Sequence, residues 1–256
     1  MAQIIAIANQ KGGVGKTTTA VNLSASLAAA ERRTLIVDLD PQANSTSGVG
    51  VDPHTLEQTV YQVLLGEAPV PSVRRETPLS HLHLLPASPD LIGAEVELIS
   101  ALAREGKLKS ALAEVRDEYD YILIDCPPSL GLLTINALTA ADRVLIPLQC
   151  EYYAMEGLSQ LLHTIRLIQR ELNPKLTLLG ILLTMFDARN NLSHQVVEEI
   201  RKHFGGEVFE TMIPRNVRLS EAPSHGLPAL LYDIASRGAA AYLDLAREII
   251  RREALP

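Results

Sequence analysis

The feature that most constrains this chain is a glycine-rich loop at positions 10–20, QKGGVGKTTTA, which lies between an apolar run at 3–9 and a helix-period stretch at 16–30. Glycines let such a loop fold tightly with its N–H groups pointing inward, and the following helix adds the positive end of its dipole. The strict pattern G-x-x-x-x-G-K-[ST] fails, because its first glycine would fall at Gln10 and K-G-G-x-G-K-T stands instead. The strand–loop–helix context still predicts a phosphate-binding loop.

Apolar runs and helix-period stretches alternate along the rest of the chain. Strand-like runs lie at 3–9, 34–38, 82–87, 121–125, 143–148, 178–185 and 208–213. Helix-period stretches lie at 16–30, 56–65, 89–102, 106–118, 130–141, 156–171, 191–203 and 236–253, and the segment from about 44 to 80 is the least regular. The strands are apolar on both faces, as parallel strands covered by helices are. We therefore predict a doubly wound α/β fold with a mostly parallel twisted sheet, formed by residues 1–256 as a single domain.

The loop carries the chemistry that a nucleoside triphosphate needs. Lys16 is expected to reach the β- and γ-phosphates, the Thr17 hydroxyl to bind Mg²⁺, and Thr18 to hold the α-phosphate. The loop therefore predicts a nucleoside triphosphate with Mg²⁺. The candidate nucleotide-binding residues of the loop are Gly12, Gly13, Val14, Gly15, Lys16, Thr17 and Thr18.

Acidic residues stand at the ends of two predicted strands. TLIVDLDPQ places Asp38 and Asp40 after the second strand, and YILIDCPP places Asp125 at the end of the fourth. Ligands of such sheets bind outside the carboxyl ends of the strands, so these carboxylates are expected to converge on the loop. An apolar run that ends in Asp is typical of a Walker B element, and Asp125 is expected to hold Mg²⁺ through water.

The charge of the chain argues against a generally basic nucleic-acid binder, because the formal net charge is −7. The charge is uneven, with −8 over residues 1–159 and +1 over 160–256. A polyanion would therefore meet the C-terminal part, through a local patch. Cys126 and Cys150 fit no disulfide or zinc pattern and are interpreted as buried thiols. No apolar run of membrane-spanning length and no signal-type start is present, so we expect a cytoplasmic protein.

Four separated motifs, KGGVGKTT, DLDPQ, LIDCPPS and IPRNVRLSEAPSHG, together resemble the ParA family, the deviant Walker A group of P-loop ATPases that partition chromosomes and plasmids. The resemblance runs from about residue 3 to about residue 250 and is to the short, Soj-like form. The chain begins two residues before its first strand, so we expect no N-terminal helix-turn-helix region and no sequence-specific operator binding.

The resemblance implies roles for further residues. Lys11 matches the signature lysine, which reaches across a dimer to the partner's phosphates and so counts among the catalytic and nucleotide-binding candidates. Asp40 matches the residue that orients the attacking water, and Asp38 is interpreted as structural support or an outer metal contact. The remaining expected contacts are Pro214 and Asn216 with the base, and Arg189 and Arg218 with DNA, with Arg201, Lys202 and Arg247 as weaker additions to the DNA surface.

The resemblance also implies partners. Two copies would sandwich two ATP molecules, coat nucleoid DNA without sequence preference and hydrolyse ATP slowly. A ParB-type centromere-binding protein with a basic N-terminal peptide would stimulate hydrolysis, and the acidic N-terminal part of the chain is a hypothetical docking surface for that peptide.

Four alternatives stay open. A MinD-like membrane-cycling ATPase shares the loop, but the tail AAAYLDLAREIIRREALP has mixed charge and no Phe or Trp, so its apolar residues fit docking onto the sheet. A nitrogenase-reductase-like protein would need cysteines placed to bridge a cluster, which Cys126 and Cys150 are not. A nucleotide switch that regulates replication initiation would use the same dimer. A small-molecule ligase of the same P-loop class is disfavoured by IPRNVRLSEAPS.

Overall fold

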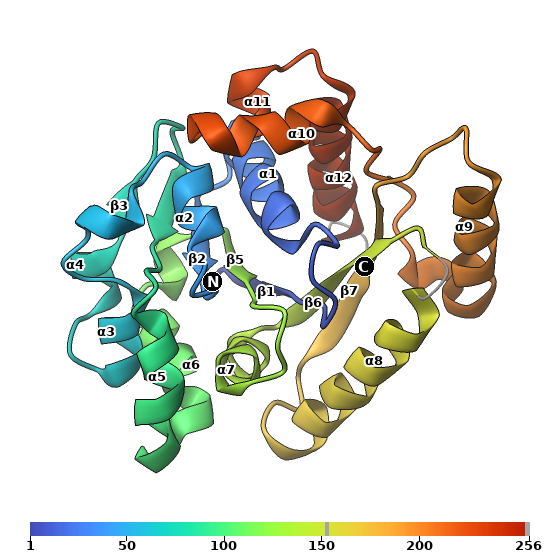
Figure 1. Ribbon diagram of the computed structural model, residues 1–256. Helices are drawn as coiled ribbons and strands as arrows, with labels where there is room; N and C mark the ends of the chain where they lie inside the picture. The colour runs from blue at the N-terminus through green and yellow to red at the C-terminus, as the bar shows by residue number, and fades with distance from the viewer. Residues whose placement is uncertain (152–153, 254–256) are drawn as a thin grey trace.

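The computed structural model describes residues 1–151 and 154–253, and its centre is a seven-stranded sheet (Figure 1). The strand order is β3-β4-β2-β5-β1-β6-β7. The strands are β1 (Gln3–Ile7), β2 (Thr34–Asp38), β3 (Arg75–Glu76), β4 (Leu82–Leu85), β5 (Tyr121–Asp125), β6 (Arg143–Gln149) and β7 (Thr177–Thr184). The edge strand β3 pairs antiparallel with β4, and the other pairings are parallel. The predicted doubly wound, mostly parallel α/β sheet is confirmed.

Helices cover both faces of the sheet (Figure 1). They are α1 (Lys16–Ala29), α2 (Asn44–Gly48), α3 (Val60–Leu65), α4 (Val70–Val73), α5 (Leu91–Glu97), α6 (Lys107–Ala113), α7 (Leu132–Ala140), α8 (Ala154–Glu171), α9 (Asn191–Phe204), α10 (Val217–Glu221), α11 (Ala229–Tyr232) and α12 (Arg237–Glu253). The segment from 44 to 80, which is irregular in the sequence pattern, contains α2, α3 and α4.

The alternation of side chains along β1 shows how the core divides into two layers. Ile4 and Ala6 point to one face and join an apolar cluster with α6 and α7. Ile5 and Ile7 point to the other face and join a cluster with α1 and α12. Positions 4 to 7 of β1 are therefore buried by helices on one side or the other, as the apolar run predicted.

The predicted strand at 208–213 is wrong. This segment lies beside β7 without forming a continuous ladder: Val208 makes an isolated bridge to Ile181, and the N–H groups of Phe209 and Ile213 donate to the Ile181 and Leu183 carbonyls at 3.0 and 2.9 Å. The backbone N–H groups of residues 210 and 211 donate to the two carboxylate oxygens of Glu248, each at 2.9 Å, instead of to a strand ladder. An apolar run cannot reveal that a distant carboxylate takes its backbone donors.

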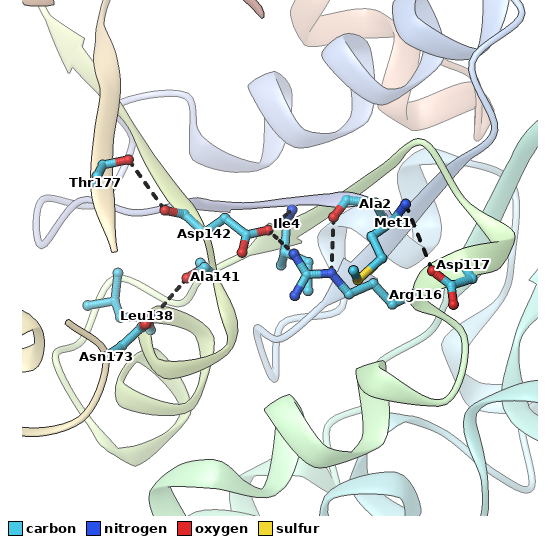
Figure 2. A network of polar contacts seen from close by, with 10 residues as sticks. All are labelled: Met1, Ala2, Ile4, Arg116, Asp117, Leu138, Ala141, Asp142, Asn173 and Thr177. Atoms are coloured by element: carbon cyan, nitrogen blue, oxygen red, sulfur yellow. Dashed lines mark hydrogen bonds and ion pairs between the residues drawn. The ribbon is translucent and has the colours of Figure 1, made fainter. Parts of the chain in front are cut away.

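A polar network ties the amino ends of the strands together, at the edge opposite the phosphate loop (Figure 2). Asp142 accepts hydrogen bonds from the Ile4 backbone N–H at 2.9 Å and from the Arg116 guanidinium at 2.6 Å. The Arg116 Nε donates to the Ala2 carbonyl at 3.2 Å, and the buried Asn173 amide donates to the carbonyl at the end of α7, Ala141, at 2.7 Å. These bonds fix β1 and β6 relative to each other and so position the loops at their carboxyl ends.

Gly180 tests the close packing of β7 against the 208–213 segment. An added Cβ would lie 2.7 Å from a ring carbon of Phe209 and 2.9 Å from the Glu207 carbonyl oxygen. We expect Gly180→Ala to lower the free energy of unfolding in urea by about 1–3 kcal/mol, since a buried ring and a backbone carbonyl must both shift. Gly206→Ala is the matched control, because nothing lies within 4 Å of its added Cβ. Equal stability of the two variants would contradict this packing.

Candidate active site

The candidate site lies at the carboxyl edge of the sheet, where β1, β2 and β5 end side by side. Asp38 and Asp125 are register partners across β2 and β5, and Asp125 is also opposite Ile7, the last residue of β1. The glycine loop follows β1 directly and leads into α1 (Figure 1). The predicted convergence of the strand-end carboxylates on this loop is therefore what the sheet produces.

The loop is held in a folded turn by its glycines and by two anchors. Gly13 and Gly15 have φ values of 73° and 91°, which side-chain-bearing residues rarely adopt. At one end, Asn9 accepts from the Lys11 backbone N–H and donates to the Pro147 carbonyl at 2.7 Å. At the other, the Thr184 hydroxyl donates to the Val14 carbonyl at 2.8 Å. The chain's own bonds thus hold the loop in shape, which lowers the entropy cost of binding a ligand.

The free space around the loop fits an anion. Nothing lies within 4 Å of a Cβ built on Gly12, so the folded chain itself does not require glycine there. Gly12 and Gly13 line a cleft of about 330 Å³ with Lys16 and Asp40. A phosphate group that approaches the backbone closely explains a glycine at position 12 better than the chain's own packing does.

Lys16 is the cation of this cleft and is held almost entirely inside it. Its side chain is buried, with 7% of the residue exposed, and its Nζ donates to the Lys11 carbonyl at 3.2 Å. Burial lowers the pKa of the Lys16 ammonium, while the charges of Asp125 and Asp40 act against that shift. An amine with one hydrogen bond and two nearby carboxylates has donors left for phosphate oxygens.

Two residues that the sequence analysis did not single out, Ser45 and Thr46, connect the strand-end carboxylates to α2. The Ser45 hydroxyl donates to Asp125 Oδ2 at 2.7 Å, and the Thr46 hydroxyl and N–H donate to Asp38 Oδ2 at 2.7 and 2.8 Å. Asp38 also accepts from the Asp40 backbone N–H at 3.2 Å. Asp38 therefore holds the segment that carries Asp40 through three hydrogen bonds. DLDPQANST resembles a polar turn, so only the fold reveals these bonds.

The environment of Asp125 fits a cation. The side chain is fully buried, and its Oδ1 has no hydrogen-bond partner among the described residues. Burial and the charge of Asp38 raise its pKa, against the effect of hydrogen bonds from Ser45 and Thr17. The described part of the chain forms no cluster of three or more His, Cys, Asp or Glu ligands. Mg²⁺ needs no such cluster, because it keeps several waters and takes one or two protein oxygens with substrate phosphates.

A second cleft continues from the loop and has the character of a base-binding site. It has a volume of about 320 Å³ and is lined by Gly15, Met185, Pro214, Asn216 and Leu219, among others. Asn216 is the N-cap of α10, and its Oδ1 accepts from the Arg218 N–H at 2.9 Å. Its amide NH₂ remains as the donor for a base edge. Both residues predicted for the base thus line one cleft beside the phosphate loop.

Comparison with known proteins agrees with this geometry. A family model described as an AAA domain matches residues 2–178. The chromosome partitioning protein ParA of Myxococcus xanthus (strain DK1622) is 61% identical over 251 residues, which cover 98% of this chain and 89% of that protein. The sporulation initiation inhibitor protein Soj of Bacillus subtilis (strain 168) is 60% identical over 249 residues, which cover 97% of this chain and 98% of that protein.

The chain belongs to the ParA/Soj family of chromosome-partitioning P-loop ATPases.

The fold is also that of a solved structure with a different name. A cobyrinic acid a,c-diamide synthase from Mycobacterium smegmatis, with bound ADP and magnesium, has a TM-score of 0.88 and 41% identity, and the match covers 100% of this chain and 96% of that one. Among residues 1–151 and 154–253, the helices lack the length and apolar character that a bilayer-spanning helix requires.

In this ParA/Soj chain Lys11, the predicted signature lysine, forms an ion pair within its own subunit. The Lys11 Nζ donates to Glu151 Oε2 at 2.8 Å, and both side chains are roughly half exposed. The Gln149 amide also donates to the Glu151 carboxylate, at 2.5 Å. An exposed pair of this kind is worth about 0–1 kcal/mol, so a stronger anion would displace it.

The two arginines predicted to bind DNA are exposed but paired. Arg189 makes two hydrogen bonds of 3.0 Å to the carboxylate of Asp187. Arg218 pairs with Glu221 at 2.7 Å and with Asp233 at 3.2 Å. Phosphate would have to compete with these carboxylates, so the local charge of both sites is lower than the arginines alone suggest.

The buried pair of carboxylates predicts that Asp125→Asn stabilises the protein in the absence of nucleotide and metal. Because the pKa of Asp125 is raised in the folded state, the wild type loses stability as pH rises from about 4 towards 7, while an amide does not ionise. The stability of the variant relative to the wild type should therefore increase between acidic and neutral pH. Urea unfolding in EDTA at two pH values measures this gain. A constant difference across the range, or a less stable variant at neutral pH, would contradict it.

Proposed function

We propose that this chain is a Mg²⁺-dependent ATPase that dimerises on ATP and binds DNA without sequence preference. A ParB-type centromere-binding protein stimulates hydrolysis, and the resulting release from DNA drives chromosome segregation. The protein acts in the cytoplasm, on the nucleoid. The observation that carries the proposal is the buried Lys16 ammonium, which faces Asp40 and an Asp125 carboxylate with an unpartnered oxygen beneath the glycine loop. The two curated relatives named for ParA and Soj support it.

Different residues of the two clefts bind the phosphates, the base and the metal and orient the attacking water. The loop N–H groups and Lys16 orient the phosphates, and the cleft with Pro214 and Asn216 holds the base. Thr17 and Asp125 would hold Mg²⁺, which when bound supplies charge neutralisation across the β- and γ-phosphates. Asp40 opens into the same cleft and would orient the attacking water, because hydrolysis of this kind depends on positioning more than on a strong base.

Lys11 links hydrolysis to dimerisation. Its ammonium lies at the rim of the loop, on an exposed residue, and its bond to Glu151 is weak enough to exchange for a triphosphate of a second copy. A cation delivered from the partner neutralises charge on the transferring phosphoryl group, and comparable arginine fingers are worth roughly 10³–10⁵ in rate. Without triphosphate, two lysines that meet across an interface repel each other, so the dimer depends on ATP.

DNA binding would follow from the same dimer. The loop that carries Arg189 and the segment that leads into α10 with Arg218 are neighbours, because the Arg215 N–H donates to the Phe186 carbonyl at 3.0 Å. In a single subunit both Arg189 and Arg218 are paired with a carboxylate. Two subunits double the phosphate contacts, so ATP can switch DNA affinity through avidity.

The alternatives are weaker on the same observations. In the membrane-cycling alternative the last helix would present its apolar stripe to lipid, but Tyr242, Leu245 and Ile249 of α12 are buried, and Tyr242 is hydrogen-bonded to Thr19 of α1 at 3.1 Å. The stripe thus belongs to the apolar cluster that α1 forms with the sheet. The ligase suggested by the name of one solved structure would show as ATP turnover that requires a small-molecule acid and ammonia or glutamine.

The dimer is tested by light scattering of the wild type with ATP or ADP beside three variants. We expect the wild type to reach twice its subunit mass only with ATP, and Asp40→Ala to stay dimeric because it binds but does not hydrolyse. Lys16→Ala should lose ATP binding. Lys11→Ala should bind ATP and remain a monomer, because its loop and Lys16 are intact. A Lys11→Ala protein that dimerises like the wild type would refute the role of this lysine.

DNA binding is tested by retention on unrelated duplex sequences. We expect retention with ATP, little with ADP, and a steep loss as salt rises, because phosphate contacts release counterions. Arg189→Ala with Arg218→Ala should weaken retention on every sequence alike and reduce the salt slope. Arg247→Ala, which removes an exposed arginine paired with Asp244, is the milder comparison. Retention that is the same with ATP, ADP and no nucleotide would contradict the proposal.

A further inference from the structure

The segment from α5 into the following turn has apolar side chains on two faces. Leu91, Ala94 and Leu98 are buried against the core. The opposite face carries Ile92, Val96, Ile99 and Leu102, which are 61%, 67%, 62% and 90% exposed. We call these four residues the α5 ridge. A surface helix normally presents polar residues on its outer face, so the ridge has no role within the folded subunit.

The ridge is unusual for the surface of this chain. Its four large apolar residues fall within eleven positions, and no other stretch of that length in the described residues exposes more than two. Scattered apolar residues on a surface need no explanation, but a contiguous row is typical of a site that binds another molecule.

The border of the ridge is acidic. Tyr61 of α3 donates from its hydroxyl to Glu97 at 2.7 Å. That hydrogen bond, with burial and the charges of Glu97, Glu67 and Asp90, raises the pKa of Tyr61 to about 12. Asp90, Glu97 and Glu67 are exposed, so the negative potential is open to solvent. At the far end the guanidinium of Arg104 is paired with Glu105 at 2.9 Å.

The ridge is mechanically close to the nucleotide cleft. Glu95, on the same helix, packs over Gly131 at the start of α7, because a Cβ on Gly131 would lie 2.3 Å from Glu95 Oε1. Gly131 belongs to the loop that follows Asp125, and Pro128 of that loop lines the cleft with Lys16. A shift of α5 would therefore press on the loop between Asp125 and α7.

We propose that the α5 ridge docks a cationic amphipathic helix of a partner protein, and that docking changes ATP turnover through Glu95 and the loop that contains Gly131. The second part rests on the proposed ATPase function, and the first does not. The apolar row receives the apolar face of such a helix, and Asp90, Glu97 and Glu67 pair with its basic residues.

The acidic border of the ridge favours a cationic helix over two other occupants, a second copy of this chain and an anionic membrane. In a two-fold contact of ridge on ridge, Asp90, Glu97 and Glu67 of one copy would face the same acidic residues of the other, which is unfavourable. An anionic membrane would likewise be repelled by the acidic border. A cationic partner gains from both the apolar row and the charges.

Docking is measured by fluorescence anisotropy with a labelled synthetic helix that has leucine on one face and lysine on the other. The peptide controls are a scrambled sequence of the same composition and a version with glutamate in place of lysine. We expect the wild-type chain to bind the amphipathic lysine peptide at least about tenfold more tightly than either control, because only it matches both the row and the border.

Variants locate the binding on the chain. Val96→Ser with Ile99→Ser should weaken binding about tenfold or more, whereas Ile234→Ser, a site 67% exposed elsewhere on the surface, should not. Asp90→Asn with Glu97→Gln should weaken binding several-fold and flatten its salt dependence, with Glu31→Gln and Glu198→Gln as the charge-matched control. Circular dichroism confirms that each variant is folded.

Three results would overturn the docking proposal. The first is unchanged peptide affinity in the ridge variants, and the second is equal affinity for the scrambled peptide. The third is that the ridge variants instead lose the dimer mass in light scattering, or lose sedimentation with anionic vesicles.

The coupling is measured as the ratio of ATP turnover with and without the lysine peptide. We expect the ratio to exceed one in the wild type, to fall to one in Val96→Ser with Ile99→Ser, and to fall in Gly131→Ala although the peptide still binds. A ratio of one in a wild type that binds both ATP and peptide would overturn the coupling alone. Failure of the wild type to bind ATP would contradict the proposed function. The docking proposal would still be tested by the anisotropy measurement, which does not depend on ATP.

Discussion

Everything at the site depends on two carboxylates, Asp38 and Asp125, that the sheet buries side by side. Burial raises the pKa of both carboxyls, the charge of Asp38 raises that of Asp125 further, and the charge of Asp40 adds to the shift of Asp38, so the free protein carries an unfavourable arrangement. Hydrogen bonds from Ser45 and Thr46 offset part of that cost and at the same time hold α2 against the strand ends. The charge of Lys16 offsets more of the cost, and a cation held by Asp125 would complete the compensation. Local instability of this kind is typical of functional sites, where the ligand supplies what the fold lacks.

Much of the fold and the position of the site could be predicted from the sequence, because both depend on local patterns. Apolar runs on both faces of each strand predicted a parallel sheet, and the glycine loop predicted where the ligand binds. The carboxyl-edge rule then predicted that Asp38, Asp40 and Asp125 converge on the loop, and Asp40 and Asp125 do lie near Lys16. The contacts of Ser45 and Thr46 could not be predicted, because they depend on which strands are neighbours. A serine in DLDPQANST shows no sign that its hydroxyl will meet an aspartate on β5.

Two further features could not be predicted for the same reason, because they depend on which distant segments become neighbours in the fold. Residues 208–213 look like a strand, but Glu248 on the last helix takes two of the backbone donors that a strand would use. In the sequence Lys11 has no evident partner within its own chain, and the fold pairs it with Glu151, just beyond β6. In the dimer that we propose, Lys11 would have to exchange this carboxylate for a phosphate of the second subunit. The proposal thus requires two distinct positions for the same ammonium.

The most direct test of the account is a crystal structure of the chain with a non-hydrolysable ATP analogue and Mg²⁺. The account predicts two subunits with their nucleotide clefts face to face. In each, the Lys11 ammonium has left Glu151 and lies on the phosphates of the other subunit, and Asp125 lies close to the metal. Clefts that face apart, or a Lys11 that still donates to Glu151 with triphosphate bound, would contradict it.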